Sequence, residues 1–213
     1  MNFDSLISCL QKEDFNSLPG EEAQFELSPL GRPNKAKALK AAKDIKESAV
    51  LLHLFPIEGK SYLSLILRNT YPGVHSGQIG FPGGKKEEKD ADFLETALRE
   101  TEEELGLKRS NLETVGHLSD LFIPPSNFLV QPFIAFSSST PNFKPDPREV
   151  QKHISFPVEH LMDDKNTFET SVLTSFKNMK IQTKAIAFEE HIIWGATAMM
   201  LSEFKALLNR NEL

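Results

Sequence analysis

The sequence predicts an α/β or α+β fold in which helices pack on a mixed β-sheet. Residues 49–55 and 61–68 are short apolar runs bounded by turn formers, which is typical of strands. Residues 91–105 have the periodicity of an amphipathic helix, and helical patterns also occur near both ends of the chain. Strands and helices are therefore intermixed, which favours helices layered on a sheet.

The expected elements follow one another closely along the chain. Apolar positions at helical spacing predict a helix over residues 3–13. A turn containing Pro56 and Gly59 joins the first two strands. The helix over 91–105 ends at Gly106, since a glycine with positive φ commonly ends a helix. We expect further strands over 112–118, 128–136, 151–156, 170–175 and 180–188, a loop over 141–150 and a C-terminal helix over 194–208.

A series of lysines stands at the end of the N-terminal region. Two interpretations are open for it. The simpler one is a solvated face, and the other is an electrostatic guide for a phosphorylated ligand. The series consists of Lys35, Lys37, Lys40, Lys43 and Lys46.

Composition and charge exclude several classes of protein. The chain has 213 residues, 39% of them hydrophobic and 25% charged, which suits one globular domain with additions. A net charge of -6 disfavours a nucleic-acid partner, because such a surface is basic. The single cysteine, Cys9, excludes an internal disulfide and a thiolate metal cluster. With neither a signal-peptide pattern nor a run of about 18 apolar residues, we expect a cytoplasmic protein without a membrane partner.

The helix over residues 91–105 gathers carboxylates on one flank. At about 100° per residue, Glu100, Glu103 and Glu104 lie together, and Glu102 lies on the other side. Like charges at these spacings repel by roughly 0.2–0.5 kcal/mol per pair. A divalent cation such as Mg²⁺ relieves this repulsion and often arrives bound to phosphate, so the flank predicts phosphate-ester or diphosphate chemistry. The expected buried stripe consists of Leu94, Ala97, Leu98, Thr101 and Leu105.

Ordinary ion pairs on a solvated helix face are the alternative to a metal site. Arg99 stands four residues from both Glu95 and Glu103 and can pair with either. Against this alternative, the cluster stands on an apolar stripe of normal width, ends in Gly106-Leu107 and follows a Phe-Pro-Gly-Gly turn. This full context favours the metal site.

The segment resembles the signature of the Nudix hydrolases, in which G-x5-E-x7-R-E-U-x-E-E-x-G-U has an aliphatic residue at U. The match consists of Gly84, Arg99, Glu100, Glu103, Glu104, Gly106 and Leu107. The interval from Gly84 to Arg99 is one residue longer than in the pattern, Asp90 approximates the early acidic position, and Thr101 replaces an aliphatic residue. The resemblance implies an α/β/α sandwich over residues 46–213, with residues 1–45 as a helical or extended appendage. It also implies Mg²⁺ or Mn²⁺ held by Glu100, Glu103 and Glu104.

A second motif is similar to the coenzyme A diphosphatase branch of this family, L-L-T-x-R-(S/A)-x3-R-x3-G-x3-F-P-G-G. The matching residues are Arg68, Gly77, Phe81, Pro82, Gly83 and Gly84. Ile66 replaces the threonine, Asn69 the small residue and Gly73 the second arginine. The resemblance implies cleavage of the diphosphate bond in coenzyme A or a derivative.

The expected site combines this motif with the acidic helix. The catalytic candidates are Glu103 and Glu100, with Glu149 in the 141–150 loop as an outside candidate for the general base. The candidates for substrate binding are Arg68, His75, Gln78, Gly83 and Gly84. Each has an ordinary alternative, such as an exposed charge for Arg68, a turn cap for His75 or a surface carboxylate for Glu149.

Other functions remain open at this point. The chemistry stays the same if the substrate is ADP-ribose, a dinucleoside polyphosphate or a nucleoside triphosphate. A regulator that binds a nucleotide without hydrolysing it belongs to a different class, although the intact glutamate flank argues against it. The resemblance also implies a possible homodimer, and the expected partner is a small diphosphate substrate.

Overall fold

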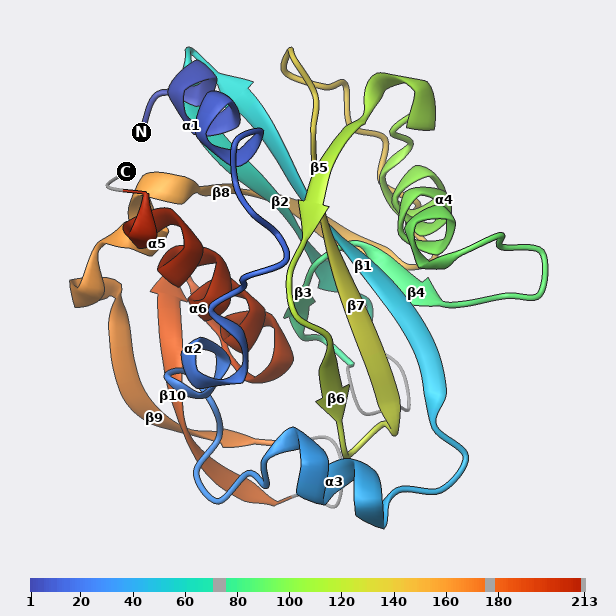
Figure 1. The fold of residues 1–213 in the computed structure, drawn as a ribbon, viewed down its shortest axis with the longest axis vertical. Helices are drawn as coiled ribbons and strands as arrows, with labels where there is room; N and C mark the ends of the chain where they lie inside the picture. The colour runs from blue at the N-terminus through green and yellow to red at the C-terminus, as the bar shows by residue number, and fades with distance from the viewer. Residues whose placement is uncertain (71–75, 175–178, 212–213) are drawn as a thin grey trace.

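The structure is a computed structural model that describes residues 1–70, 76–174 and 179–211. Within these residues, a mixed sheet of eight strands has the order β3-β2-β1-β7-β5, with β4 paired to β1, β6 to β7 and β8 to β2. A three-stranded antiparallel sheet of order β11-β10-β9 lies beside it (Figure 1). No helix in the described part of the chain is long and apolar enough to cross a membrane.

The elements have the following bounds. The helices are α1 (Phe3–Leu10), α2 (Gly20–Phe25), α3 (Lys35–Ala41), α4 (Phe93–Leu105), α5 (Val158–Met162) and α6 (Gly195–Arg210), with 3-10 turns at Arg109–Asn111 and Asp164–Asn166. The strands of the main sheet are β1 (Lys46–Ile57), β2 (Lys60–Arg68), β3 (Ile79–Gly80), β4 (Gly83–Lys85), β5 (Glu113–His117), β6 (Leu121–Ile123), β7 (Phe128–Phe136) and β8 (Val150–Pro157). The second sheet contains β9 (Thr167–Leu173), β10 (Lys180–Phe188) and β11 (His191–Ile193).

The predicted hairpin of the first two strands is confirmed. β1 and β2 pair antiparallel, with Ile57 opposite Lys60, so that only Glu58 and Gly59 form the turn. Both have positive φ, 49° and 76°. This is the backbone of the two-residue turns that match the right-handed twist of paired strands.

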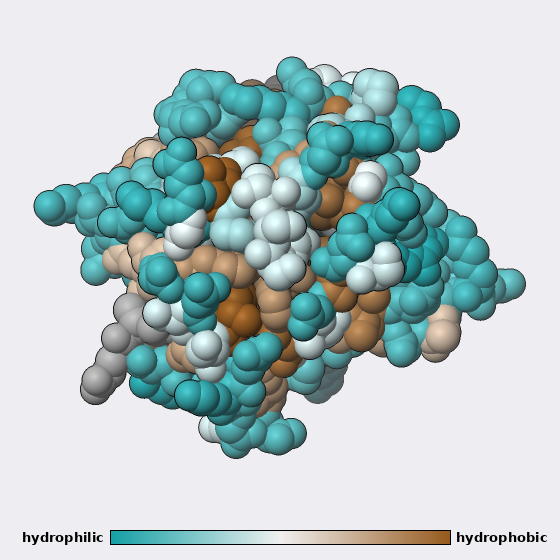
Figure 2. Space-filling model, turned by 90° about the horizontal axis from the view of Figure 1, so that it is seen from above, coloured by the Kyte–Doolittle hydropathy of each residue, from teal (hydrophilic) through white to brown (hydrophobic). Residues whose placement is uncertain are grey.

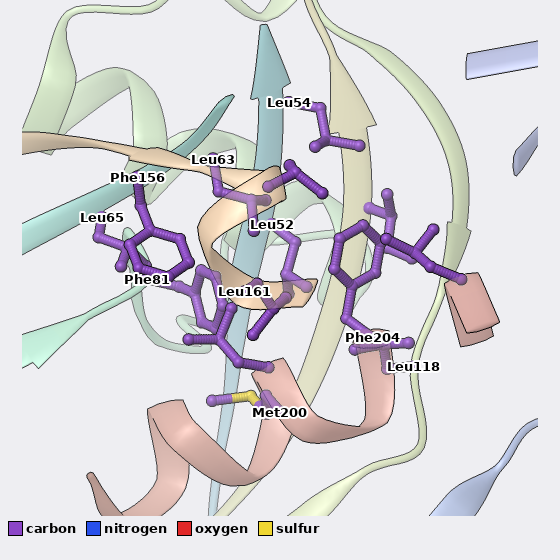
Figure 3. Close-up of a cluster of buried hydrophobic side chains, with 14 of the residues drawn as sticks. Leu52, Leu54, Leu63, Leu65, Phe81, Leu118, Phe156, Leu161, Met200 and Phe204 are labelled. Carbon is purple, nitrogen blue, oxygen red and sulfur yellow. The ribbon is translucent and has the colours of Figure 1, made fainter. Parts of the chain in front are cut away.

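Five consecutive residues of the central strand β1, 51–55, are buried. Since successive side chains point to opposite sides of a sheet, both faces of this strand are covered. Ala49 and Leu51 pack against Ala97 of α4 on one face. Leu52 and Leu54 face the larger core, into which α6 inserts Met200 and Phe204 and α5 inserts Leu161 (Figure 3). A mixed sheet between helices confirms the predicted fold class (Figure 1).

The sequence patterns missed the short elements. α2, α5, β3, β4, β6 and β11 each have six residues or fewer, too few for a periodic pattern to be distinctive. The lysine-rich stretch contains α3, and Lys37 and Lys40 are exposed there, as expected for a solvated face. Lys35 instead pairs with Asp120, which ties α3 to the segment before β6.

The N-terminal residues pack on the main core. Phe3, Leu6, Ile7 and Leu10 of α1 belong to the same buried cluster as the strand side chains. The predicted helix over 3–13 ends earlier, at Leu10. The molecular surface is largely hydrophilic in the view from above, with hydrophobic side chains showing between polar ones (Figure 2).

A buried carboxylate on α6 fixes the next N-terminal segment. Glu203 is fully buried and accepts hydrogen bonds from the backbone N–H groups of Gly20 and Ser119, both at 3.1 Å, and from the side-chain amide of Gln24 at 2.8 Å. One charge therefore joins α2, α6 and the segment before β6. Three donors around one carboxylate are the arrangement in which a buried charge is tolerated.

Replacing Glu203 with alanine should lower the free energy of unfolding by about 2–5 kcal/mol, because buried donors lose their acceptor. Urea denaturation measures the change. Glu22→Ala, in an exposed carboxylate of α2, is the matched control and should change stability by no more than about 0.5 kcal/mol. Equal losses in the two variants would contradict the role given to Glu203.

A second buried polar group lies on the α4 side of β1. His53 is fully buried between Ser64 and Ser137, with its two ring nitrogens 2.8 and 2.9 Å from their hydroxyl oxygens. Burial, with a smaller contribution from His153, lowers the pKa of His53 to about 3. In the unfolded chain this imidazole binds a proton at its ordinary pKa of 6.5, so folding stability falls as the pH falls below 6.5.

The variant His53→Gln retains groups that can hydrogen-bond the two serines but cannot titrate. Between pH 7 and pH 4 we expect the wild type to lose about 3 kcal/mol more unfolding free energy than this variant. Urea denaturation across this pH range gives the unfolding free energy of each protein as a function of pH. The difference between the two slopes is the contribution of His53. Parallel profiles would mean that His53 titrates alike in the folded and unfolded states.

Candidate active site

The acidic helix α4 begins and ends at residues suited to these positions. The Asp92 side chain accepts a hydrogen bond from the Glu95 N–H at 2.8 Å, which caps the first turn. Gly106 ends the helix with a φ of 68°. The prediction of a helix over 91–105 is confirmed apart from its first two residues.

More side chains of α4 are buried than those of the predicted apolar stripe. Ala97, Thr101 and Leu105 are buried as expected, and Leu94 and Leu98 are partly buried. The buried hydroxyl of Thr101 donates to the Ala97 carbonyl oxygen at 2.7 Å, so threonine fits where the family pattern has an aliphatic residue. Thr96, Arg99 and Glu104 are buried too, and each bonds within residues 83–90 or with Arg68.

Glu104 is the most enclosed of the three glutamates. Its side chain is 1% exposed, with Oε2 2.8 Å from the Gly83 N–H and Oε1 3.1 Å from Nη1 of Arg68. The pKa of this carboxyl is raised to about 7, chiefly by burial. Arg68 and the Gly83 N–H oppose the rise, and the charges of Glu100 and Glu149 contribute to it. A nearby cation would lower it again, as opposite charge favours the ionised form.

Glu100 lies directly against Gly84. A Cβ atom added to Gly84 would be 2.4 Å from the Glu100 carboxyl carbon, so the carboxylate occupies space that only a glycine leaves open. Burial is the largest cause that raises the pKa of Glu100, while Arg99 lowers it and Glu103 and Glu149 raise it. Gly83 has a similar constraint, since its Cβ would lie 2.3 Å from the Ala49 carbonyl oxygen.

Arg99 links the acidic helix to the segment that precedes it. Its Nε and Nη2 donate to the two carboxylate oxygens of Asp90 at 2.8 and 2.9 Å, and Nη1 lies 2.9 Å from Glu100 and 3.0 Å from Glu103. The hydrogen bonds with Asp90 raise the pKa of Arg99 above its usual range and lower that of Asp90. The open choice of partner is thereby resolved, since Arg99 pairs with Glu103 and Glu95 pairs with Arg109.

Glu103 and Glu149 are the more accessible carboxylates. The side chain of Glu103 is 50% exposed, and Glu149 lies exposed in the turn before β8. The charge of Glu149 raises the pKa values of both Glu100 and Glu104, so it acts on the same site from a different element. The Asp146 and Lys144 N–H groups donate to the last carbonyls of α4, which holds the loop against the helix.

The donor set fits a hard divalent cation, because it consists of carboxylate oxygens on one side of a helix. Burial raises the pKa values of Glu100 and Glu104 because it disfavours their ionised forms. A bound cation would favour the ionised forms again. Arg99 contacts both Glu100 and Glu103, whereas Glu104 pairs with Arg68 instead. Among the described residues, Glu189, Glu190 and His191 form the group of three carboxylate or histidine ligands whose atoms all lie within 4.8 Å of one another, so the three helix glutamates are spaced more widely than this. Binding one ion with all three helix glutamates therefore requires side-chain rotation.

The structure brings most of the expected substrate-binding residues to one place. Arg68, Gln78, Gly83 and Gly84 line the same pocket of about 760 Å³. Arg68 also bonds to Glu104 and to the Gly83 carbonyl oxygen at 3.1 Å. His75 lies outside the described residues.

Comparison with known proteins agrees with this arrangement. The NUDIX domain family model matches residues 46–175. The chain belongs to the Nudix family. The match begins at the first residue of β1, so α1 to α3 precede it, and β10, β11 and α6 follow it.

Individual Nudix relatives cover different parts of the chain. Nudix hydrolase 3 of Caenorhabditis elegans is 26% identical over 96% of this chain and 91% of its own length. The human mitochondrial coenzyme A diphosphatase NUDT8 is 31% identical over 74% of this chain and 66% of its own. The mouse peroxisomal coenzyme A diphosphatase NUDT7 is 30% identical over 60% of this chain and 53% of its own. Together with the family match, these hydrolases support a Nudix pyrophosphohydrolase.

A solved structure shows the same fold. The MutT/nudix family protein of Enterococcus faecalis has a TM-score of 0.53 over 91% of this chain and 75% of its own, at 14% identity. At this identity the likeness concerns the fold alone.

Two features of the Nudix site were not found from the sequence. Asp90 was only an approximate match, yet it is the two-oxygen acceptor for Arg99. An aspartate and an arginine could have suggested an Asp90–Arg99 ion pair. The interval from Gly84 to Arg99 is one residue longer than in the family pattern, so Asp90 did not stand at the expected position. No sequence pattern predicts that residues 29–33 line the pocket, because their position depends on contacts with segments that are distant in the sequence.

The variant Gly84→Ala tests the position of Glu100. The added methyl group should displace the Glu100 carboxylate and weaken Mn²⁺ binding at least tenfold, while the fold is retained because the obstacle is the end of a side chain. Calorimetric titration measures the affinity, and circular dichroism checks the fold. Gly80→Ala is the matched control, since its Cβ would have an ordinary contact at 3.6 Å. Unchanged Mn²⁺ affinity in Gly84→Ala would remove Glu100 from the ion site.

Proposed function

We propose that this Nudix protein is a metal-dependent hydrolase that cleaves the diphosphate bond of coenzyme A or a derivative. The observation that carries the proposal is the meeting of Glu100 and Glu104 with the glycine pair at the wall of a large pocket. Carboxylates and a close backbone approach at one point suit a cation that carries a diphosphate. The coenzyme A diphosphatases among the relatives support this choice of substrate.

Glu100, Glu103 and Glu104 would hold Mg²⁺ or Mn²⁺. When bound, such an ion stabilises charge on phosphoryl oxygens and lowers the pKa of bound water. Arg99 keeps Glu100 and Glu103 on one side of the helix in the absence of other cations. Arg68 and the Gly83 N–H keep Glu104 oriented from the opposite side.

A carboxylate that is not fully used as a ligand would accept the proton of the attacking water. A glutamate of α4 is the first candidate, and Glu149 is the second. Glu149 is exposed, lies on a loop anchored to α4 and interacts electrostatically with Glu100 and Glu104. The products from coenzyme A would be an adenosine bisphosphate and phosphopantetheine. We also expect a cytoplasmic location.

Replacing Glu103 or Glu104 with glutamine should reduce turnover by at least about a hundredfold, because each change removes a negative charge from the ion site. Steady-state kinetics with coenzyme A and Mg²⁺ or Mn²⁺ gives the turnover number. Glu102→Gln is the matched control, since Glu102 lies on the other flank of the same helix and pairs with Arg109. It should retain turnover within about threefold. Full activity in both test variants would reject this site.

Product analysis in ¹⁸O-labelled water separates the substrate classes. Coenzyme A, ADP-ribose, a dinucleoside polyphosphate and a nucleoside triphosphate are compared under the same metal concentration. Mass spectrometry identifies the products and the phosphorus atom that receives the label. Cleavage of ADP-ribose but of no coenzyme A derivative would overturn the substrate assignment, and binding without any turnover would indicate a regulator.

A further inference from the structure

The loop over residues 141–150 depends on neighbouring elements for its position. It contains Pro141, Pro145 and Pro147, and a proline has a fixed φ and no N–H to donate. Such a loop is stiff, but it has few donors of its own for holding itself in place. Glu149 lies at its end, directly before β8, so the contacts that fix the loop also fix this carboxylate.

The first half of the loop is fixed to the sheet and to the end of α4. The ring of Phe143 stacks on His153 of β8, with the ring centroids 3.7 Å apart. The Lys144 and Asp146 N–H groups donate to the last carbonyl oxygens of α4 at 2.9 and 3.0 Å. Glu149 lies beyond these contacts and has a separate support.

Asn69 provides this support with two hydrogen bonds. Its side-chain amide donates to the Pro147 carbonyl oxygen at 2.8 Å, and its backbone N–H donates to the Glu149 carbonyl oxygen at 3.1 Å. Because Asn69 directly follows β2, both bonds tie the loop to the main sheet. The Glu149 and Val150 N–H groups donate to the Asp146 carbonyl oxygen at 3.1 and 2.9 Å, which closes the turn between the two halves of the loop.

A β-bulge determines where this turn meets the sheet. The register between β2 and β8 shifts just before Arg68, which leaves Gln151 as an extra residue. Bulges bend a strand locally and re-aim the side chains next to them. Val150 lies opposite Arg68 and packs in a buried cluster with Leu105 of α4. The strand β8 therefore begins against the acidic helix, with Glu149 immediately before it.

The Glu149 carboxylate is available to accept a proton. Each of the three glutamates on the acidic flank of α4 pairs with Arg68 or Arg99. In the described part of the chain, the Glu149 carboxylate has neither a hydrogen bond nor an ion pair, and the residue is exposed. Its charge contributes to the raised pKa values of Glu100 and Glu104, so it acts on the same site.

We propose that Asn69 is a positioning residue that holds Glu149 beside the acidic helix, so that Glu149, rather than a glutamate of α4, accepts the proton of the attacking water. The inference rests on the proposed function, because it needs a diphosphate bound at the acidic helix. The coenzyme A diphosphatase motif has serine or alanine at this position, and an alanine has no group that could donate to Pro147.

The proton transfer accompanies the cleavage of one bond. The water oxygen forms a bond to phosphorus, and the bridging P–O bond breaks with its electron pair going to the leaving phosphate. The water proton goes to the Glu149 carboxylate. Asn69 touches none of the reacting atoms and acts only through the position of Glu149.

A double-mutant cycle tests whether Asn69 acts through Glu149. Asn69→Ala removes one hydrogen bond of the turn and should lower kcat about two- to tenfold while KM changes by less than about twofold. Glu149→Gln should lower kcat at least about a hundredfold. Adding Asn69→Ala to Glu149→Gln should then change kcat by less than about 1.5-fold, because residues that act as a unit are not additive.

Asn166→Ala is the matched control for the lost hydrogen bond. The Asn166 side-chain amide donates to the His160 carbonyl oxygen, also at 2.8 Å, and Asn166 lies in the 3-10 turn before β9. Urea denaturation should show similar losses of stability in Asn166→Ala and Asn69→Ala. Steady-state kinetics should show a kcat within about 1.5-fold of the wild type in Asn166→Ala, because this bond positions no reacting group.

Hydrogen exchange measured by mass spectrometry reports the position of the loop without turnover. The Glu149 and Val150 amides are hydrogen-bonded in the turn and exchange slowly while it is formed. Their exchange should be at least about twofold faster in Asn69→Ala, as the loss of one hydrogen bond implies, and unchanged in Asn166→Ala. Unchanged exchange in Asn69→Ala would overturn the role given to Asn69.

The kinetic outcomes separate this inference from the proposed function. Hydrolysis of coenzyme A with an equal kcat in the wild type and Asn69→Ala, or with full activity in Glu149→Gln, would overturn the inference and leave the proposed function intact. Equal losses from Asn69→Ala in both backgrounds would reduce Asn69 to a structural residue. Hydrolysis of ADP-ribose but of no coenzyme A derivative would overturn the proposed substrate, and the same cycle with ADP-ribose would decide the role of Asn69. No hydrolysis of any diphosphate would overturn both.

Discussion

The arrangement of the site depends on one buried cation, the guanidinium of Arg99. It binds both oxygens of Asp90 and also contacts Glu100 and Glu103, and it donates to the Lys85 carbonyl oxygen at 3.2 Å. Without this charge, carboxylates from a helix and from the segment before it would repel at close range. Arg99 therefore joins two elements that their own charges would separate, and it sets the direction of the acidic flank.

The glycine pair completes this arrangement from the other side of the helix. Gly83 donates its N–H to Glu104, and Gly84 leaves space for Glu100. Both glycines belong to β4, which pairs with residues 48–50 of the central strand β1, so the carboxylates are positioned against the main sheet. A rigid strand on one side and a buried arginine on the other explain how acidic groups can be kept close together before an ion binds.

The sequence predicted the elements with strong local patterns. The hairpin of β1 and β2, the acidic helix and the strand over Phe128–Phe136 follow from apolar periodicity, turn residues and a terminal glycine. The metal candidates followed from charges three and four residues apart. Contacts between distant segments were beyond this reasoning. The burial of Glu203 against Gly20 and Ser119 is one example. The enclosure of Arg99 and Glu104 by residues 83–90 and Arg68 is another.

The N-terminal segment shows why such contacts matter for function. Glu203 holds Gly20, α2 leads to residues 29–33, and this segment lies across β10 and β6 at the pocket wall. A chain with the same acidic helix but another N-terminal segment would keep the carboxylate cluster and have a different pocket. The acidic helix and glycine pair lie within the family match, whereas residues 29–33 and the start of α6, which shape the rest of the pocket, lie outside it. The two parts are fixed by separate contacts, Arg99 with Asp90 for the acidic helix and Leu30 with Gln182 for the N-terminal segment, so either can change without the other.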